Sequence, residues 1–222
     1  MIGVYDYTVV LTYLSMVSAS LGIVISLSGY PYLGVFFLLV CGLFDGFDGK
    51  VASKKQNRSS YEKNFGIQID TLSDLVAFGI LPACIGVAVF RTSSFLQPFL
   101  ENSFVLEIVL FVILLLYVLA ALVRLAHFNV TEDERQKVEK GTRKYYTGLP
   151  VTSAAIILPP VMLLRYMVPI DISLLYFLVM LFMAFLFVFK FQLKKLDMKG
   201  ILFFVFLGVI EFGTFLIFKF IK

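Results

Sequence analysis

Long stretches of this chain are apolar on every face of a helix, and Ile108–Val123 is an example. A stretch of about twenty apolar residues crosses the hydrocarbon core of a bilayer as a helix. The strands of a membrane barrel would instead alternate polar and apolar residues. With 60% hydrophobic and 15% charged residues, the chain also departs from the roughly 45–50% and about 25% of soluble domains. These features predict an all-α, polytopic transmembrane helix bundle, and they exclude a soluble α/β enzyme and a porin.

The apolar stretches number about seven, so we expect about seven helices, within a range of six to eight. No internal repeat divides them, and we expect a single transmembrane domain over residues 1–222. The predicted spans are Thr8–Leu27, Tyr32–Val51, Ile67–Phe90, Phe104–Phe128, Leu149–Val168, Ser173–Phe189 and Ile201–Ile221.

Basic residues gather in the loops on one side of these spans. The loops after the second, fourth and sixth spans hold fourteen lysines and arginines, whereas the opposite loops hold only Arg91 and Arg165. By the positive-inside rule, the amino terminus and the three basic loops are cytoplasmic, which predicts an integral protein of the cell membrane. Contact with anionic lipid explains many of these basic residues equally well.

Other features of the sequence bear on processing and partners. The first apolar stretch follows Asp6 rather than a basic region, so we expect no cleavable signal peptide. Cys41 and Cys84 lie inside apolar stretches, away from other cysteines and from the histidine, and we expect both to be core residues. The net charge of +4 is explained by orientation in the bilayer, so no nucleic-acid partner is expected.

Four aspartates lie within or beside the predicted spans, where an ionisable side chain needs a partner or a function. Asp45 and Asp48 close the second span at a spacing of three, and Asp70 and Asp74 open the third at a spacing of four. Each spacing places the pair on one helix face, so the four carboxylates can converge near the cytoplasmic side. Four like charges repel one another, and either protonation or bound cations relieve this repulsion. All-oxygen ligands favour Mg²⁺, Mn²⁺ or Ca²⁺ over zinc or copper.

Three glycines, Gly46, Gly49 and Gly66, accompany these aspartates. A glycine removes the side chain from the helix surface, so that a ligand can approach the backbone. For any single glycine, close helix packing by small residues is the better explanation. It does not explain three glycines beside four acids.

The aspartates and glycines together resemble the motif of the CDP-alcohol phosphatidyltransferases. They read Asp45-x-x-Asp48-Gly49-x-x-Ala52, followed by Gly66-x-x-x-Asp70-x-x-x-Asp74. The chain departs from the family pattern at Ser53, where an arginine usually follows the alanine, and its loop to Gly66 is longer than usual. Lys54 and Lys55 are candidates for the role of that arginine.

Further stretches are similar to the integral-membrane phosphatidylserine synthases within that family. They are Gly66–Gly79 with Pro82-Ala83, Arg124–Val130 and Thr147–Pro150. The resemblance covers residues 5 to 160, with a motif core at 45–74, and His127 stands where relatives have arginine or tyrosine. The last helices, at about 171–222, carry no motif and are expected to be accessory.

The resemblance implies an enzyme of phospholipid synthesis whose site faces the cytoplasm. Such an enzyme transfers the phosphatidyl group of CDP-diacylglycerol to the hydroxyl of L-serine, giving phosphatidylserine and CMP. The reaction would use two divalent ions, Mg²⁺ or Mn²⁺, with Ca²⁺ as a further candidate. Asp45, Asp48 and Asp70 would be metal ligands, and Asp74 both a ligand and the general base. Whether the chain forms a homodimer is left open.

The resemblance also assigns residues to the two substrates. The residues expected to bind the CDP-lipid are Gly49, Ala52, Ser53, Lys54 and Gly66. Those expected to bind serine are Arg124, Asn129 and Arg143, although an arginine that snorkels to the interface explains Arg124 equally well.

Two alternatives remain open at this point. One is a synthase of the same family that uses another acceptor, such as inositol phosphate or glycerol phosphate. The other is a cation transporter, which is disfavoured because the acids lie at one end of the spans and no inverted halves are visible. A scaffold protein would leave the buried charges unexplained.

Overall fold

The structure is a computed structural model, and it describes residues 2–55, 57–96, 98, 104–138, 145–167, 171–194 and 213. These residues form six helices and one pair of short strands. The helices are α1 (Val10–Leu27), α2 (Pro31–Ser53), a continuous helix made of α3 (Ser60–Asp74), the π-helical turn η1 (Leu75–Ile80) and α4 (Leu81–Thr92), then α6 (Phe104–Val138), α7 (Ala154–Met167) and α8 (Ser173–Val188). A 3₁₀ turn, η2 (Val151–Ser153), precedes α7, and strands β1 (Tyr145–Thr147) and β2 (Gln192–Lys194) pair antiparallel.

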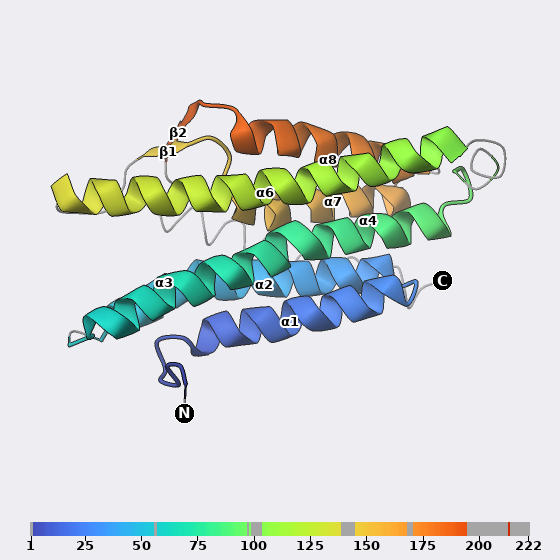
Figure 1. Cartoon of the computed structure of the whole chain (residues 1–222). Coiled ribbons are helices and arrows are strands. Elements are labelled where there is room, and N and C mark those ends of the chain that lie inside the picture. Colours follow the sequence, from blue (N-terminus) through green and yellow to red (C-terminus); the bar gives the residue numbers. More distant parts are fainter. Residues whose placement is uncertain are drawn as a thin grey trace.

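Four of these helices are long and apolar enough to cross a membrane. They are Val10–Leu27, Pro31–Ser53, Ser60–Thr92 and Phe104–Arg135, while α7 and α8 are shorter apolar helices. All of them run roughly along one axis (Figure 1). The predicted all-α membrane bundle is therefore confirmed.

The continuous helix from α3 to α4 lies between two groups of helices. On one side α1 packs closely against α2, and on the other α6 packs against α8 (Figure 1). The core at this junction includes Phe78, Leu81 and Tyr117, all fully buried. Pro82 has no N–H to offer the Phe78 carbonyl four residues earlier, and the Tyr117 hydroxyl donates to that carbonyl instead, at 2.8 Å. A side chain of α6 thus satisfies the backbone of the central helix.

Two helix boundaries differ most from the prediction. The third helix begins at Ser60 rather than at Ile67, because the Ser59 hydroxyl accepts from the Glu62 N–H while the Glu62 side chain accepts from the Ser59 N–H. Asp70 and Asp74 therefore lie within this helix rather than at its start. The helix predicted over Phe104–Phe128 continues to Val138. The seventh predicted span falls, apart from Gly213, outside the described residues.

The segments rich in basic residues meet at one end of the bundle. The end of α2, the start of α3, the end of α6 and both strands all lie there, on the left of Figure 1. The structure therefore brings together the loops that the charge count placed on a single side. The amino-terminal segment reaches the same end.

Candidate functional site

Three of the four predicted aspartates converge between α2 and α3. One carboxylate oxygen from each of Asp45, Asp70 and Asp74 lies within 4.8 Å of the other two. Asp70 and Asp74 are one helical turn apart, so both face α2. The described residues show no salt bridge to any of the three, which leaves their charges to be balanced by something else.

The fourth aspartate, Asp48, lies on the outer side of this cluster. Its side chain contacts that of Asp70, and its Oδ2 accepts a 3.4 Å hydrogen bond from the Thr12 hydroxyl of α1. The Ser73 hydroxyl donates in turn to the Thr12 carbonyl, at 3.2 Å. Asp70 thus belongs both to the inner cluster and to an outer pair with Asp48.

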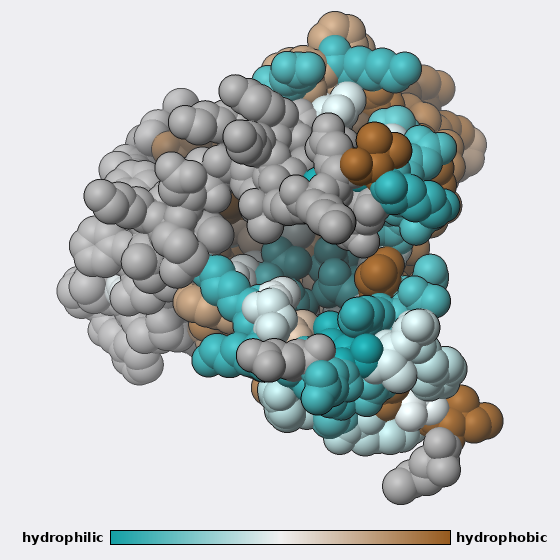
Figure 2. Space-filling model, turned by 90° about the vertical axis from the view of Figure 1, so that its left-hand side faces the viewer, coloured by the Kyte–Doolittle hydropathy of each residue, from teal (hydrophilic) through white to brown (hydrophobic). Residues whose placement is uncertain are grey.

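An open pocket adjoins the outer pair, with about 450 Å³ of empty volume. Seen end-on, this end of the molecule has a hollow with hydrophilic side chains within it and below it (Figure 2). The pocket is lined by residues of α1, α2 and α3 and of the segments before α1 and α3. They are Thr8, Val9, Thr12, Asp48, Gly49, Ala52, Arg58, Lys63, Gly66, Ile67 and Asp70.

The two glycines of the pocket have different surroundings. A Cβ on Gly49 would have no atom within 4 Å, so the backbone there is open to a ligand. A Cβ on Gly66 would lie 2.7 Å from Nη2 of Arg58. Gly66 therefore lets the Arg58 guanidinium lie against α3.

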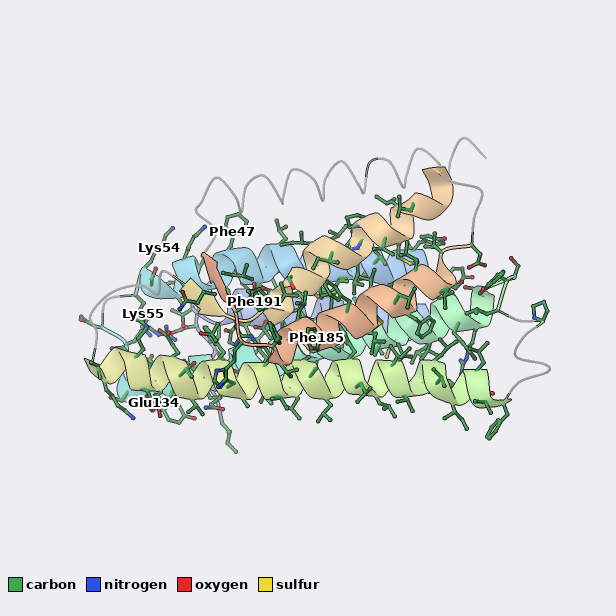
Figure 3. All side chains as sticks on the ribbon, turned by 90° about the horizontal axis from the view of Figure 1, so that it is seen from above. Phe47, Lys54, Lys55, Glu134, Phe185 and Phe191 are labelled. Carbon is green, nitrogen blue, oxygen red and sulfur yellow. The ribbon has the colours of Figure 1, made fainter. Side chains whose placement is uncertain are left out.

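The residues predicted around Ser53 divide into two groups. Ala52 lines the pocket, as Gly49 and Gly66 do. Ser53 is exposed, its hydroxyl donates to the Lys50 carbonyl at 2.8 Å, and it is not among the lining residues. Lys54 is also exposed and absent from the lining, and it points outward from the end of α2 (Figure 3).

Two cationic residues of the pocket, Arg58 and Lys63, were not predicted. Nη2 of Arg58 donates to the Glu62 carbonyl at 3.1 Å, while its buried Nε finds no hydrogen-bond partner in the described part of the chain. The sequence did hold a signal for them, because both lie in the segment between Asp48 and Asp70. A pocket lined by two cations and two glycines is suited to a phosphate group.

The predicted serine-binding residues lie on α6. Arg124 is only 4% exposed and its Nε donates to the Leu149 carbonyl at 2.9 Å, so it does not snorkel to the interface. Asn129 donates from Nδ2 to the Thr71 hydroxyl at 2.7 Å, which places it beside the residue that follows Asp70. Arg143 lies outside the described residues.

The donor set suits a hard divalent cation. Carboxylate oxygens are the ligands that Mg²⁺, Mn²⁺ and Ca²⁺ prefer, and those of Asp45, Asp70 and Asp74 are close enough to share one ion. The contact of Asp48 with Asp70 adds oxygens on the pocket side. The cluster and the pocket together therefore offer both a cation site and a phosphate site.

Comparison with known proteins agrees with this arrangement. The family model of CDP-alcohol phosphatidyltransferases matches residues 8–193. The chain is 37% identical over 139 residues to CDP-diacylglycerol–serine O-phosphatidyltransferase of Saccharomyces cerevisiae, covering 60% of this chain and 44% of that protein. It is 30% identical over 146 residues to archaetidylserine synthase of Methanothermobacter thermautotrophicus, covering 64% and 53%.

A third relative, CDP-diacylglycerol–serine O-phosphatidyltransferase of Mycobacterium leprae, is 29% identical over 146 residues, with 66% of this chain and 43% of that protein covered. The chain thus spans about half the length of the curated relatives it matches. The family match includes all four aspartates and every helix described above. The chain is therefore an integral membrane protein that belongs to the CDP-alcohol phosphatidyltransferase family.

Proposed function

We propose that this protein transfers the phosphatidyl group of CDP-diacylglycerol to the hydroxyl of L-serine, giving phosphatidylserine and CMP. The observation that carries the proposal is the double position of Asp70, in the aspartate cluster and in the wall of the pocket. A cation held by the cluster would therefore lie beside a phosphate held in the pocket. Phosphoryl-type transfer needs a cation beside the phosphate, because the negative charge on the phosphate must be neutralised.

The names of the relatives favour serine as the acceptor. All three names contain serine. They differ in the lipid, which is diacylglycerol in two names and an archaetidyl group in the third. Inositol phosphate and glycerol phosphate are the alternative acceptors within the family. The relatives therefore support the choice of acceptor more strongly than the choice of lipid chain.

The pocket is proposed to hold the CDP part of the donor. Arg58 and Lys63 would pair with its phosphates, and Gly49, Ala52 and Gly66 would leave room along the backbone. Ser53 and Lys54 were predicted to take part, but both are exposed at the end of α2. Arg58 is thus a better candidate than Lys54 for the role of the arginine that the family motif carries.

In the proposed reaction the serine hydroxyl oxygen attacks the phosphorus that carries diacylglycerol. The bond from that phosphorus to the oxygen of CMP breaks, and CMP leaves with its phosphate. Asp74, which lies in the cluster one helical turn beyond Asp70, is proposed to take the hydroxyl proton. Divalent ions, proposed to be two Mg²⁺ or Mn²⁺ held by Asp45, Asp48, Asp70 and Asp74, would neutralise charge on the phosphate oxygens.

The acceptor is proposed to enter beside α6. Asn129 lies next to the cluster through its bond to Thr71, and Arg124 is a buried cation one to two turns earlier on the same helix. A serine carboxylate would pair with a guanidinium group. Arg143 remains a third candidate for this role. By the positive-inside rule, this end of the bundle is proposed to face the cytoplasm, from which serine would enter.

The direct test is a panel of acceptors. Purified protein is incubated with CDP-diacylglycerol, Mg²⁺ or Mn²⁺, and serine, inositol, inositol phosphate or glycerol phosphate in separate reactions. We expect CMP release and a phosphatidyl product in the reaction with serine and in none of the reactions with the other three acceptors. Product from another acceptor and none from serine would overturn the acceptor, and no CMP release with any acceptor would overturn the transferase.

The role of Asp74 has its own test. We expect Asp74→Asn to abolish turnover while CDP-diacylglycerol binding survives better than in Asp45→Asn, because a base acts mainly in the chemical step. Binding to each variant is measured by titration calorimetry in detergent. Equal loss of binding in both variants would remove the general-base role from Asp74.

A further inference from the structure

The amino-terminal segment before α1 forms one wall of the pocket. Thr8 and Val9 line the cavity, and Oδ1 of Asp6 accepts from the Thr8 N–H at 2.9 Å. The Tyr13 hydroxyl ties the segment back to α1 by donating to the Val4 carbonyl at 2.8 Å. The position of this wall therefore depends on what holds Asp6.

Asp6 is held by a lysine that follows the end of α2. Nζ of Lys55 lies 2.6 Å from Oδ2 of Asp6 and 2.6 Å from Oε1 of Glu62. The three side chains are each only about one quarter exposed. The hydrogen bond from Lys55 is the largest influence that lowers the pKa of Asp6, to about 2, so this carboxylate stays ionised at neutral pH.

The second partner of Lys55 leads to the opposite wall. Oε2 of Glu62 accepts from the Ser59 N–H at 2.7 Å, and the Glu62 carbonyl accepts from Nη2 of Arg58 at 3.1 Å. Arg58 lines the pocket beside Gly66. Glu62 thus fixes both the first turn of α3 and the guanidinium group that faces the cavity.

We propose that Lys55 is a positioning residue that clasps the two walls of the pocket together, with Asp6 on one side and Glu62 on the other. Lys55 is itself absent from the residues that line the cavity, so it acts through Thr8 and Arg58 rather than by touching the ligand. The identity of that ligand, a CDP-lipid, rests on the proposed function. The clasp joins residues that are far apart in the sequence, at positions 6, 55 and 62.

The competing explanation is that Lys55 pairs directly with a substrate phosphate. The two explanations differ in what Asp6→Asn does. Direct pairing leaves Lys55 available after Asp6→Asn, so donor binding holds or improves. A clasp fails when either partner is lost, so Asp6→Asn and Lys55→Met weaken donor binding alike and the double variant is no worse than Lys55→Met.

The experiment uses the full chain in nanodiscs with CDP-diacylglycerol, serine and Mn²⁺. We expect Lys55→Met to raise KM for CDP-diacylglycerol by about fivefold to thirtyfold, or about 1–2 kcal/mol at about 1.4 kcal/mol per tenfold, with kcat changed less than about twofold. Lys55→Arg should restore most of the loss. The matched control is Lys137→Met, which removes a 2.7 Å lysine–aspartate ion pair at the same end of the bundle without touching the pocket.

Hydrogen–deuterium exchange supplies a readout that needs no substrate. The amides of Thr8 and Val9 should exchange faster in Lys55→Met and Asp6→Asn, and unchanged in Lys137→Met. Unchanged exchange in Lys55→Met, or faster exchange with an unchanged KM, would overturn the clasp. So would normal donor binding in Asp6→Asn. If the parent chain bound no CDP-diacylglycerol, the proposed function would fail, while the exchange rates would still decide whether Lys55 holds the wall.

Discussion

The two ends of the bundle use aspartate in opposite ways. At the end away from the pocket, Asp171 accepts hydrogen bonds from the Ser93 hydroxyl at 3.0 Å and from the Phe95 N–H at 3.3 Å. It also accepts from the N–H and the hydroxyl of Ser173, at the start of α8. At the pocket end, Asp45, Asp70 and Asp74 face one another without a cationic partner among the described residues.

The difference distinguishes an aspartate that stabilises the fold from aspartates that are proposed to bind a ligand. The donors around Asp171 satisfy its charge, so the ligand-free protein is stabilised by it. The carboxylates of the cluster repel one another, so they destabilise the ligand-free protein. A bound cation turns this destabilisation into a net stabilisation. Activity and stability should therefore respond to the two kinds of aspartate in opposite ways.

The largest effect should follow Asp70→Asn. Because Asp70 belongs to both the cluster and the pocket, we expect kcat/KM to fall by about a thousandfold or more, or about 4 kcal/mol at 1.36 kcal/mol per tenfold. In chelator the variant should melt no lower than the parent chain, since one repelling charge is gone. Full activity in the variant, or a Tm in chelator well below that of the parent chain, would contradict the proposed difference between the aspartates at the two ends.

The second largest effect should be the stabilisation of the parent chain by divalent cations. At one hundred times the dissociation constant, Mg²⁺ or Mn²⁺ adds about 2.7 kcal/mol by mass action, which a thermal melt reads as a higher Tm. Asp45→Asn, which removes one oxygen donor of the cluster, should lose most of this gain. If divalent cations raised the Tm of Asp45→Asn as much as that of the parent chain, the cation would bind outside the cluster.

At the other end, Asp171→Ala should lower the free energy of unfolding by about 1–3 kcal/mol. It removes the acceptor of two hydrogen bonds at the start of α8 and of two from the segment after α4. Thermal melts in detergent measure this loss. Turnover at a temperature where the variant is folded should match that of the parent. A specific loss of kcat there would show that the two ends are coupled.

The smallest effect concerns the pH dependence of that loss. Burial raises the pKa of Asp171, but the hydrogen bonds from Ser173, Ser93 and Phe95 outweigh it, so the pKa lies below its ordinary value of 3.8. A carboxyl whose folded pKa is depressed stabilises the fold above its unfolded pKa and loses this contribution as pH falls through its folded value. The difference in Tm between the parent and Asp171→Ala should therefore stay constant from about pH 8 to 5 and shrink below about pH 4. A difference that shrank instead between pH 8 and 6 would contradict the sign.

The long apolar stretches predicted the helix bundle, and the spacing of the four acids predicted that the aspartates converge, because both signals are local in the sequence. Asp70 and Asp74 are one turn apart, so their shared face follows from helix geometry alone. The start of α3 was also encoded locally, in the Ser59-x-x-Glu62 signature, although the apolar stretch alone placed it at Ile67.

The pocket cations could not be assigned in the same way. Neighbouring residues in a loop can point in any direction, so Lys54, Lys55 and Arg58 could not be ranked by spacing. The structure separates them, since Lys54 is exposed, Lys55 pairs with Asp6 and Glu62, and Arg58 lies against Gly66. The outcomes for Lys55 and Arg58 depend on tertiary contacts. Similarly, the burial of Arg124 depends on the Leu149 carbonyl, twenty-five residues away in the sequence.

The π-helical turn η1 directly after Asp74 can be read as a one-residue insertion in an otherwise regular helix. An extra residue in a regular α-helix would turn everything after it by about 100°, but the wider π turn takes up that residue, so the helix faces before and after it keep their relation. Deleting one residue within Leu75–Ile80 should therefore leave a regular helix in which α4 still packs against α6. Deleting one residue between Asp70 and Asp74, where the helix is regular, would instead turn one aspartate away from the other.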